Sequence, residues 1–232
     1  MAYYFLFYFQ ILGLLSWLTI PYWYEYLIVT LCIYFLASCL GGTMTYHRLL
    51  AHKSWNCPKP LMRLFVLFQT ITMTGSAIAW VALHREHHRY SDSEKDPHSP
   101  YYKGLFKMHF MSMFQKPKVK YAKDLLKDKF LKIQHEYYLH INIFYAGILL
   151  SIDPWALVYA WLAPAALVWN ANSLIISYSH KDGTPSNNFL LGLITFGEGW
   201  HLNHHRNSKL KKLHKYDIGG IIIENIEKYV KT

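Results

Sequence analysis

The sequence contains few charged residues, and acidic residues are especially scarce. Only 16% of its 232 residues are charged, and 14 Asp and Glu stand against 24 Lys and Arg, which gives a formal net charge of +10. Hydrophobic residues make up 53% of the chain and aromatic residues 17%. This composition is too apolar and too unevenly charged for an ordinary soluble domain, and it is typical of a membrane protein.

Cysteine is also scarce. The sequence holds three, Cys32 and Cys39 in an apolar stretch and Cys57 in a more polar one, so no disulfide framework is indicated. The positive charge is not accompanied by a recognition module for nucleic acid, so we expect no nucleic-acid partner. The lysine-rich run 116–132 indicates an amphipathic segment against anionic lipid headgroups. An acidic electron donor would be attracted to the same charge.

Lysine and arginine are absent from two long blocks, residues 1–47 and 138–180. Each block is long enough for a helical hairpin, because a membrane-spanning helix needs about 20 residues. Under the positive-inside rule, both termini and all the basic segments then lie in the cytoplasm. We therefore predict one all-α, polytopic membrane domain over residues 1–232. It would have four transmembrane helices in two hairpins, at 4–20, 27–46, 138–152 and 156–179, and a cytoplasmic helical cap formed by 47–137 and 180–232.

A further apolar stretch, residues 64–83, is long enough to cross a bilayer. A crossing there would place His47 and His84 on opposite faces of the membrane and would export several basic residues. We therefore expect this stretch to lie at the interface or under the cap. A fifth span is the alternative.

Histidine is the residue that stands out. Clusters occur in HRLLAH (residues 47–52), HREHH (84–88) and HLNHH (201–205), with a single further histidine in SYSHKDG. Histidines at i, i+3 and i+4 share one face of a helix, so the two HxxHH triplets would present six nitrogen donors to a common centre. The set exceeds the shell of one ion, so we predict a cytoplasmic site for two ions with these ligands: His47, His52, His84, His87, His88, His180, His201, His204 and His205.

The ligands that are missing narrow the choice of metal. HEYYLH at 135–140 departs from the HExxH motif of zinc proteases, and only Glu198 with His201 has the Glu-x-x-His spacing of carboxylate-bridged di-iron bundles. Imidazole suits iron, zinc and copper alike, and iron is the best redox-active candidate. His47 and His52 would lie about 140° apart on an α-helix, so we expect the second span to bend or end there.

Three runs in this order, HRLLAH, WVALHREHHRYSDSEKDPHSP and GEGWHLNHHR, with a hydrophobic hairpin before the first and the third, resemble the membrane fatty-acyl desaturases of the Δ9 type. The resemblance extends from about residue 27 to the end. Ala82 and Leu83 replace the Arg-Asp of acyl-CoA desaturases, which favours the acyl-lipid branch.

The resemblance implies that the nine histidines bind two Fe ions. It also implies O2 as co-substrate and a cis double bond, at Δ9, in a saturated acyl chain of a lipid or thioester. Electrons would come from a separate donor of the ferredoxin or cytochrome b type. The protein would lie in a bacterial inner membrane or the endoplasmic reticulum.

The resemblance also points to residues around the metals. Where acyl-CoA desaturases carry an asparagine that completes a metal shell through water, this chain has Ile176, so the site would be a ligand short. Asn172, one turn deeper, or water alone would fill the gap. Carboxylates that accept the free imidazole N–H are expected from Glu86, Asp92, Asp96 and Glu198. For Glu86 a solvated salt bridge is the alternative.

Residues for the substrate follow from the same comparison. Phe35 and Cys39 precede His47 on the second span, with Cys39 roughly 12 Å below it, and would form the floor of an acyl tunnel. Ordinary packing is the alternative. Trp80, Asp96, His98 and Trp200 are candidates for the tunnel mouth and the headgroup, although interface anchoring also explains the tryptophans.

Two other functions remain open. A di-iron hydroxylase or ketolase acting on alkyl chains, sterols or carotenoids would use the same oxidant. A non-enzymatic zinc or copper carrier would place polar ligands within the spans rather than at their cytoplasmic ends.

Overall fold

A computed structural model describes residues 2–18, 24–112 and 115–230, with side chains from residue 8 onward. In these ranges the regular secondary structure is helical, apart from one isolated β-bridge between Asn187 and Trp200, and turns and loops connect the helices. This confirms the all-α fold class. The elements in order are α1 (Ala2–Ser16), α2 (Tyr24–Tyr34), the π-helix η2 (Phe35–Ala51), α3 (Lys59–Thr70), α4 (Ala77–Tyr90), α5 (Pro100–Lys103), α6 (Leu105–Met111), the 3₁₀ turns η4 (Val119–Ala122) and η5 (Leu125–Lys127), α7 (Lys129–Glu136), α8 (Tyr138–Ile152), the π-turn η6 (Val158–Leu162), α9 (Ala163–Ser179), α10 (Phe189–Ile194), α11 (His201–Arg206) and α12 (Ile218–Val230).

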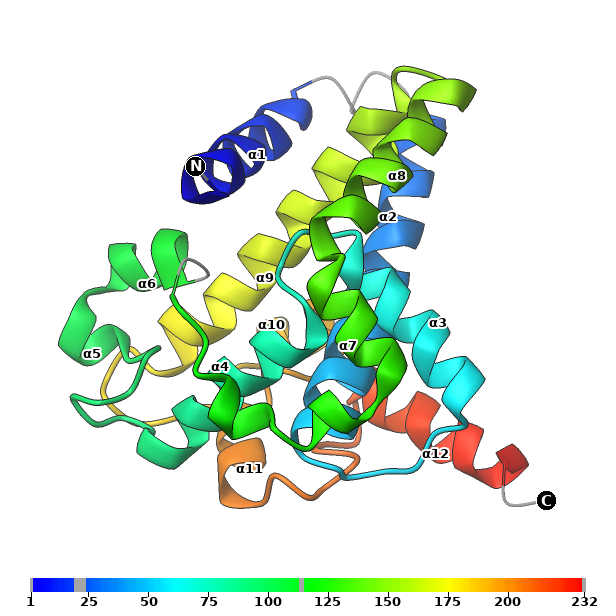
Figure 1. Cartoon of the computed structure of the whole chain (residues 1–232). Coiled ribbons are helices and arrows are strands. Elements are labelled where there is room, and N and C mark those ends of the chain that lie inside the picture. The colour runs from blue at the N-terminus through cyan, green and yellow to red at the C-terminus, as the bar shows by residue number, and fades with distance from the viewer. Residues whose placement is uncertain (1, 19–23, 113–114, 231–232) are drawn as a thin grey trace.

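Two continuous helices among the described residues are long and apolar enough to cross a membrane. They are Tyr24–Ala51, with 28 residues, and Val158–Ser179, with 22, and they agree with the predicted spans 27–46 and 156–179. The Tyr26 and Tyr159 rings stack with their centroids 4.2 Å apart, and Thr30 Oγ1 donates to Tyr159 O at 2.7 Å. Figure 1 shows both helices descending from the top of the molecule toward α4 and α11.

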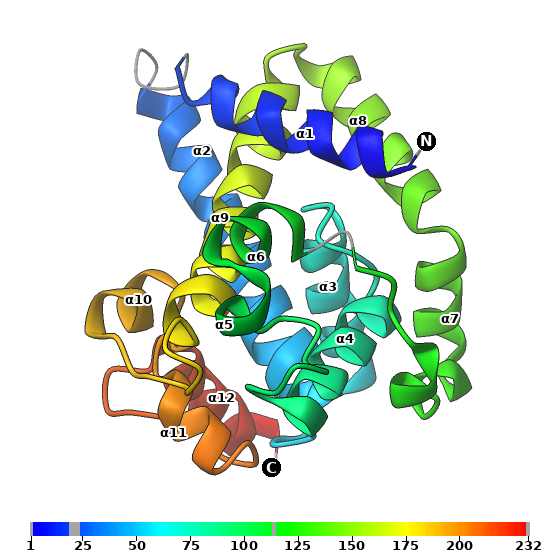
Figure 2. The same ribbon diagram turned by 90° about the vertical axis from the view of Figure 1, so that its left-hand side faces the viewer.

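The remaining apolar helices are shorter. α1 and α8 have 15 residues each, below the roughly 20 residues of a full crossing. α8 has the predicted bounds 138–152, whereas α1 ends at Ser16, and residues 19 and 20 of the predicted span 4–20 lie outside the described residues. α8 exposes large apolar side chains such as Phe144 and Ile152, each 72% exposed. Both helices lie in the upper half of the molecule in Figure 2.

The apolar stretch 64–83 is not one helix. α3 ends at Thr70 and α4 begins at Ala77, and the turn between them contains Met73 at φ 58° and Gly75 at φ 106°. Trp161 and Trp169 donate their indole N–H groups to the carbonyls of residues 71 and 72, at 2.7 and 2.8 Å. These bonds attach the turn to the long helix η6–α9. The segment therefore does not form one straight helix that could cross a membrane, in agreement with the expectation that it is not a fifth span.

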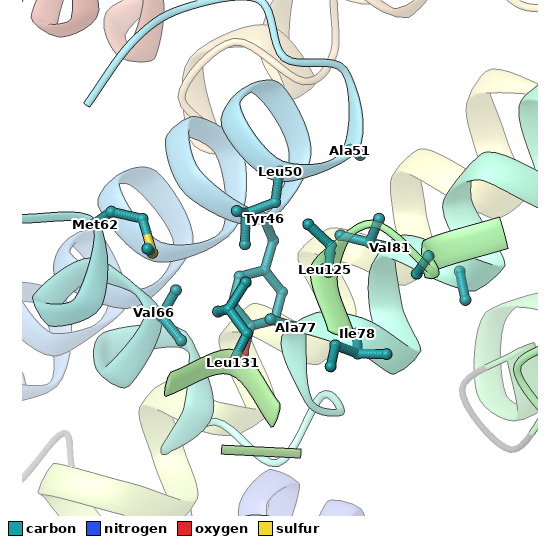
Figure 3. Packing of buried hydrophobic residues seen from close by; sticks show 12 residues of the cluster. Tyr46, Leu50, Ala51, Met62, Val66, Ala77, Ile78, Val81, Leu125 and Leu131 are labelled. Atoms are coloured by element: carbon teal, nitrogen blue, oxygen red, sulfur yellow. The ribbon is translucent and has the colours of Figure 1, made fainter. Parts of the chain in front are cut away.

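A buried cluster fixes the π-helix against α4. Figure 3 shows the ring of Tyr46 at its centre, with apolar side chains from α3, α4, η5 and α7 around it. Tyr46 and Ile78 are completely buried, and Leu131 is 1% exposed. Because Tyr46 precedes His47 and Ile78 lies on the helix that bears His84, this packing sets the distance between two of the histidine clusters.

Candidate metal centre

The first histidine cluster lies at the end of the π-helix. His47 is within η2 and His52 directly follows it, and the His52 N–H donates to His47 O at 3.1 Å, an i to i+5 bond. Such bonding places residues i and i+5 one turn apart. The His47 and His52 rings accordingly lie 4.9 Å apart. The expected 140° separation was wrong, because it assumed α-helical geometry.

The structure brings all nine predicted histidines together, in two adjacent groups. The five-histidine group contains His47, His52, His84, His88 and His204, and the four-histidine group contains His87, His180, His201 and His205. Within each group the ligand atoms lie within 4.8 Å of one another.

Each HxxHH triplet is divided between the groups. From α4, His84 and His88, which are four residues apart, belong to the five-histidine group, and His87 belongs to the four-histidine group. From α11, the i, i+4 pair His201 and His205 joins the four-histidine group. The sequence predicted a common centre for two ions, and in the structure each of the two helices contributes histidines to both groups.

The spacing of the nitrogens fits metal coordination. His204 Nε2 lies 3.0 Å from His47 Nε2 and 2.8 Å from His88 Nε2, and His201 Nε2 lies 2.8 Å from His180 Nε2. Two imidazole nitrogens bound at right angles about 2.1 Å from one ion lie about 3 Å apart. The nitrogens within each group therefore match the donor set of a transition metal.

Burial keeps five of these imidazoles neutral. It lowers the pKa of His84, His87, His201 and His204 well below the usual value, and neighbouring histidines lower it further. The pKa of His88 falls to about 3 for the same reasons. Neutral imidazole is the form that binds metal, so these five side chains need lose no proton at neutral pH.

Three carboxylates face the opposite nitrogens. Glu198 Oε2 lies 2.6 Å from His47 Nδ1, Asp96 accepts from His87 Nδ1 at 2.9 Å, and Asp92 accepts from His180 Nδ1 at 2.8 Å. A carboxylate on Nδ1 fixes the tautomer and leaves the Nε2 lone pair for a metal. This agrees with the expectation for Glu198, Asp92 and Asp96 as groups that orient imidazoles.

Two carboxylates differ from their expected roles. Glu86 pairs with Lys118 Nζ at 2.5 Å, so it forms a salt bridge, but at 3% exposure its carboxylate is buried and not solvated as the alternative had it. Asp96, also predicted near the headgroup, is completely buried and accepts the backbone N–H groups of Asp92 and His98 at 3.0 and 2.7 Å. Its bonds are directed to the protein and not to a substrate entrance.

Replacing Asp96 by asparagine is expected to weaken metal binding about 10- to 100-fold, the usual effect of removing a carboxylate that orients a ligand. The amide can still accept from the backbone, but it no longer holds a proton on His87 Nδ1 by charge. The measurement is the metal affinity of the purified variant compared with that of the wild type. The matched control is Asp182→Asn, which makes the same change at an exposed residue. Equal affinities for the Asp96 variant and the wild type would contradict the role.

A cavity of about 170 Å³ adjoins the histidines. Besides the histidines and Glu198, its wall takes residues from α4, from α9 and from the segments 74–75 and 112–117. The wall includes Thr74, Gly75, Ala79, Trp80, Leu83, His84, His87, His98, Ser112, Gln115, Pro117, Asn172, Ile175, Ile176, His180, Glu198 and His201. Trp80 also stacks on His84, with ring centroids 4.9 Å apart. Two predicted substrate residues, Trp80 and His98, thus border the cavity.

The other predicted substrate residues lie elsewhere. Cys39 is completely buried in a cluster with Met44 and Phe65, and Phe35 packs edge-on against Phe196 at 5.3 Å. Neither belongs to the cavity wall, because the π-helix turns these positions toward α3 and α12. Trp200 stacks on His214 at 3.8 Å, away from the cavity. These three residues thus lie outside this cavity, and their substrate roles stay predictions.

The four-histidine group is the one beside Ile176. Asn172 and Ile176 both line the cavity next to His180 and His201. The five-histidine group has one more imidazole. The two histidine groups are therefore unequal in size, and the ligand expected to be missing at Ile176 would belong to the smaller group.

Sequence reasoning missed Arg48 and Asp217. Both are almost completely buried, at 1% and 0% exposure, and Arg48 Nη1 lies 2.8 Å from Asp217 Oδ2. The only available signal was an arginine directly after His47 in a segment otherwise free of charge.

An all-helical fold with two histidine groups beside an apolar cavity fits the class of histidine-ligated metalloproteins. The family model described as "Fatty acid desaturase" matches residues 21–217. The chain belongs to the fatty acid desaturase family.

Curated relatives support this assignment. The "sn-1 stearoyl-lipid 9-desaturase" of Synechocystis sp. is 35% identical over 75% of this chain and 58% of its own length. The "sn-2 palmitoyl-lipid 9-desaturase" of Nostoc sp. is 31% identical over 88% of this chain and 77% of its own. "Acyl-CoA desaturase 1" of Saccharomyces cerevisiae is 30% identical over 82% of this chain and 42% of its own. The chain thus spans a little over half of the Synechocystis relative and less than half of the yeast one.

Proposed function

We propose that this protein is an O2-dependent fatty acyl desaturase that introduces a cis double bond, at the Δ9 position, into a saturated acyl chain. The observation that carries the proposal is the pair of histidine groups at the wall of an apolar cavity. The similarity to proteins named 9-desaturases supports the reaction and its position. The overall change converts –CH2–CH2–, O2, two electrons and two protons into –CH=CH– and two waters.

The nine histidines are proposed to hold two Fe ions. A bound pair of iron ions supplies, with O2, the oxidising power that an unactivated C–H bond requires and that acid–base side chains lack. The protein supplies position. Glu198, Asp92 and Asp96 orient the ligands, and the apolar side chains of Leu83, Ile175 and Ile176 would hold methylenes against the metal groups and exclude water.

The membrane arrangement is part of the proposal. The helices Tyr24–Ala51 and Val158–Ser179 would cross the bilayer, and α1 and α8 would complete two hairpins. The single domain 1–232 would then have its cap, 47–137 and 180–232, and both termini in the cytoplasm. The absence of Lys and Arg from residues 1–47 and 138–180 supports this orientation. The location would be a bacterial inner membrane or the endoplasmic reticulum.

The substrate and the electron donor follow from the same reasoning. An acyl lipid is favoured over an acyl thioester, because Ala82 and Leu83 stand where acyl-CoA desaturases have Arg-Asp. A separate protein of the ferredoxin or cytochrome b type would supply electrons, and the lysine-rich run 116–132 would attract an acidic donor.

Expression in a host that lacks its own desaturase tests the function. We expect a new mono-unsaturated fatty acid, with its double bond located by mass spectrometry, and its loss in the His87→Ala variant. The loss follows because His87 belongs to the four-histidine group. Hydroxylated chains would instead indicate the hydroxylase or ketolase. Bound zinc or copper without any O2-dependent product would indicate a metal carrier.

A further inference from the structure

Arg48 lies between the five-histidine group and the C-terminal segment. Its Nη1 donates to both oxygens of Asp217, at 2.8 and 3.1 Å, and to Lys211 O at 2.9 Å. Asp217 also accepts the backbone N–H groups of Leu213 and Gly220 at 2.7 and 2.9 Å. Asp217 therefore ties residues 211–220 to the helix that carries His47.

The other side of the Arg48 guanidinium faces Glu198. Arg48 Nη2 lies 3.6 Å from Glu198 Oε1, while Oε2 of the same carboxylate lies 2.6 Å from His47 Nδ1. The two oxygens of Glu198 are thus divided between an arginine and a metal-site histidine.

Little space remains for another arrangement of these groups. The preceding residue, Gly197, has φ 120°, and a Cβ there would lie 2.0 Å from Asp217 Oδ1 and 2.6 Å from Arg48 Nη2. The turn that carries Glu198 is therefore packed directly against the Arg48–Asp217 pair. A chain of contacts runs from Asp217 through Arg48 and Glu198 to His47.

We propose that Asp217 is a positioning residue for the five-histidine metal site. By fixing Arg48 it sets the direction of Glu198, and through Glu198 the direction of the His47 Nε2 lone pair. Without the Asp217 charge, the buried guanidinium loses its main partner and takes Glu198 instead, which draws that carboxylate away from His47. The inference rests on the proposed two-metal site and is independent of the substrate.

Cobalt titration of the metal-free protein in detergent tests this, followed by visible absorption and by metal analysis after dialysis. Asp217→Asn is expected to lower the affinity for one of the two bound ions by about tenfold or more, which is the usual effect of losing a residue that orients a metal ligand. The affinity for the other ion should not change. The matched control is Glu224→Gln. It makes the same change from carboxylate to amide on α12, in a partly exposed pair with Lys212 at 2.8 Å, and should alter neither affinity.

Two further variants separate positioning from general stability. In the Glu198→Gln background, Asp217→Asn is expected to cause no additional loss, because the contact route passes through Glu198. The double variant Arg48→Met, Asp217→Asn removes the buried guanidinium together with its carboxylate partner. Glu198 then has no arginine to orient it, so this variant should also weaken the binding of one ion.

Three results would overturn the inference. The first is a wild-type cobalt affinity in the Asp217→Asn variant, and the second is a wild-type affinity in the double variant. The third is a loss of affinity from Asp217→Asn in the Glu198→Gln background that is as large as the loss in the wild-type background. A wild-type protein that binds no cobalt would overturn the metal site itself and this inference with it.

Discussion

Replacing His204 by alanine is expected to release one bound metal ion and to reduce the unsaturated product to background. His204 Nε2 lies within 3.0 Å of the Nε2 atoms of both His47 and His88, so it is central to the five-histidine group. Removing its imidazole leaves an empty space between the Nε2 atoms of His47 and His88. Because the proposed reaction with O2 would use both ions, the loss of one would abolish it.

Metal per protein chain and fatty acid composition are the two measurements. The control is His140→Ala, which makes the same change at an exposed histidine near the start of α8 and should retain both metal and product. A His204→Ala protein that keeps two ions and full product would contradict the assignment of the ligands.

Replacing Ala79 by tryptophan is expected to abolish the product while leaving the metal content unchanged. Ala79 lies in the cavity wall, close along α4 to Trp80 and Leu83. An indole ring added at this position would occupy much of a cavity of about 170 Å³. The acyl chain would then be excluded, whereas no histidine changes its partners.

The measurement pairs product analysis with metal analysis of the same purified protein. Ala79→Ser, a small change at the same position, should keep most of the activity. Full activity of the tryptophan variant would show that the substrate does not enter this cavity. A loss of metal together with activity would show that the side chain distorts α4 instead.

Which histidines make up the candidate metal site could be predicted from the sequence, because it depends on local helix geometry. Histidines three and four residues apart on a helix share a face whatever surrounds them, and all nine candidates lie in the two groups. How they divide was not predictable. Whether His87 joins His84 or His201 depends on the angle between α4 and α11, which tertiary packing determines.

The depth of the expected acyl floor has a related difficulty. Phe35 and Cys39 were assigned by resemblance, and the depth of Cys39 below His47 was counted with α-helical geometry, but this segment is a π-helix, whose turn differs from that of an α-helix. The link between Arg48 and Asp217 joins residues 169 positions apart. No spacing rule connects such positions, so only the folded chain shows the pair.

The π-helix has a consequence for the thermodynamics of the protein. A long π-helix is rare and less favourable than an α-helix of the same sequence, and only its wider turn brings His47 beside His52. An ion that binds both histidines therefore binds one helical form and not the other, and its binding free energy stabilises that form. Metal binding and the equilibrium between the π-helical and α-helical forms of this segment are then linked. Substitutions within Phe35–Ala51 that favour the α-helix would reduce metal affinity even where their side chains contact no ligand.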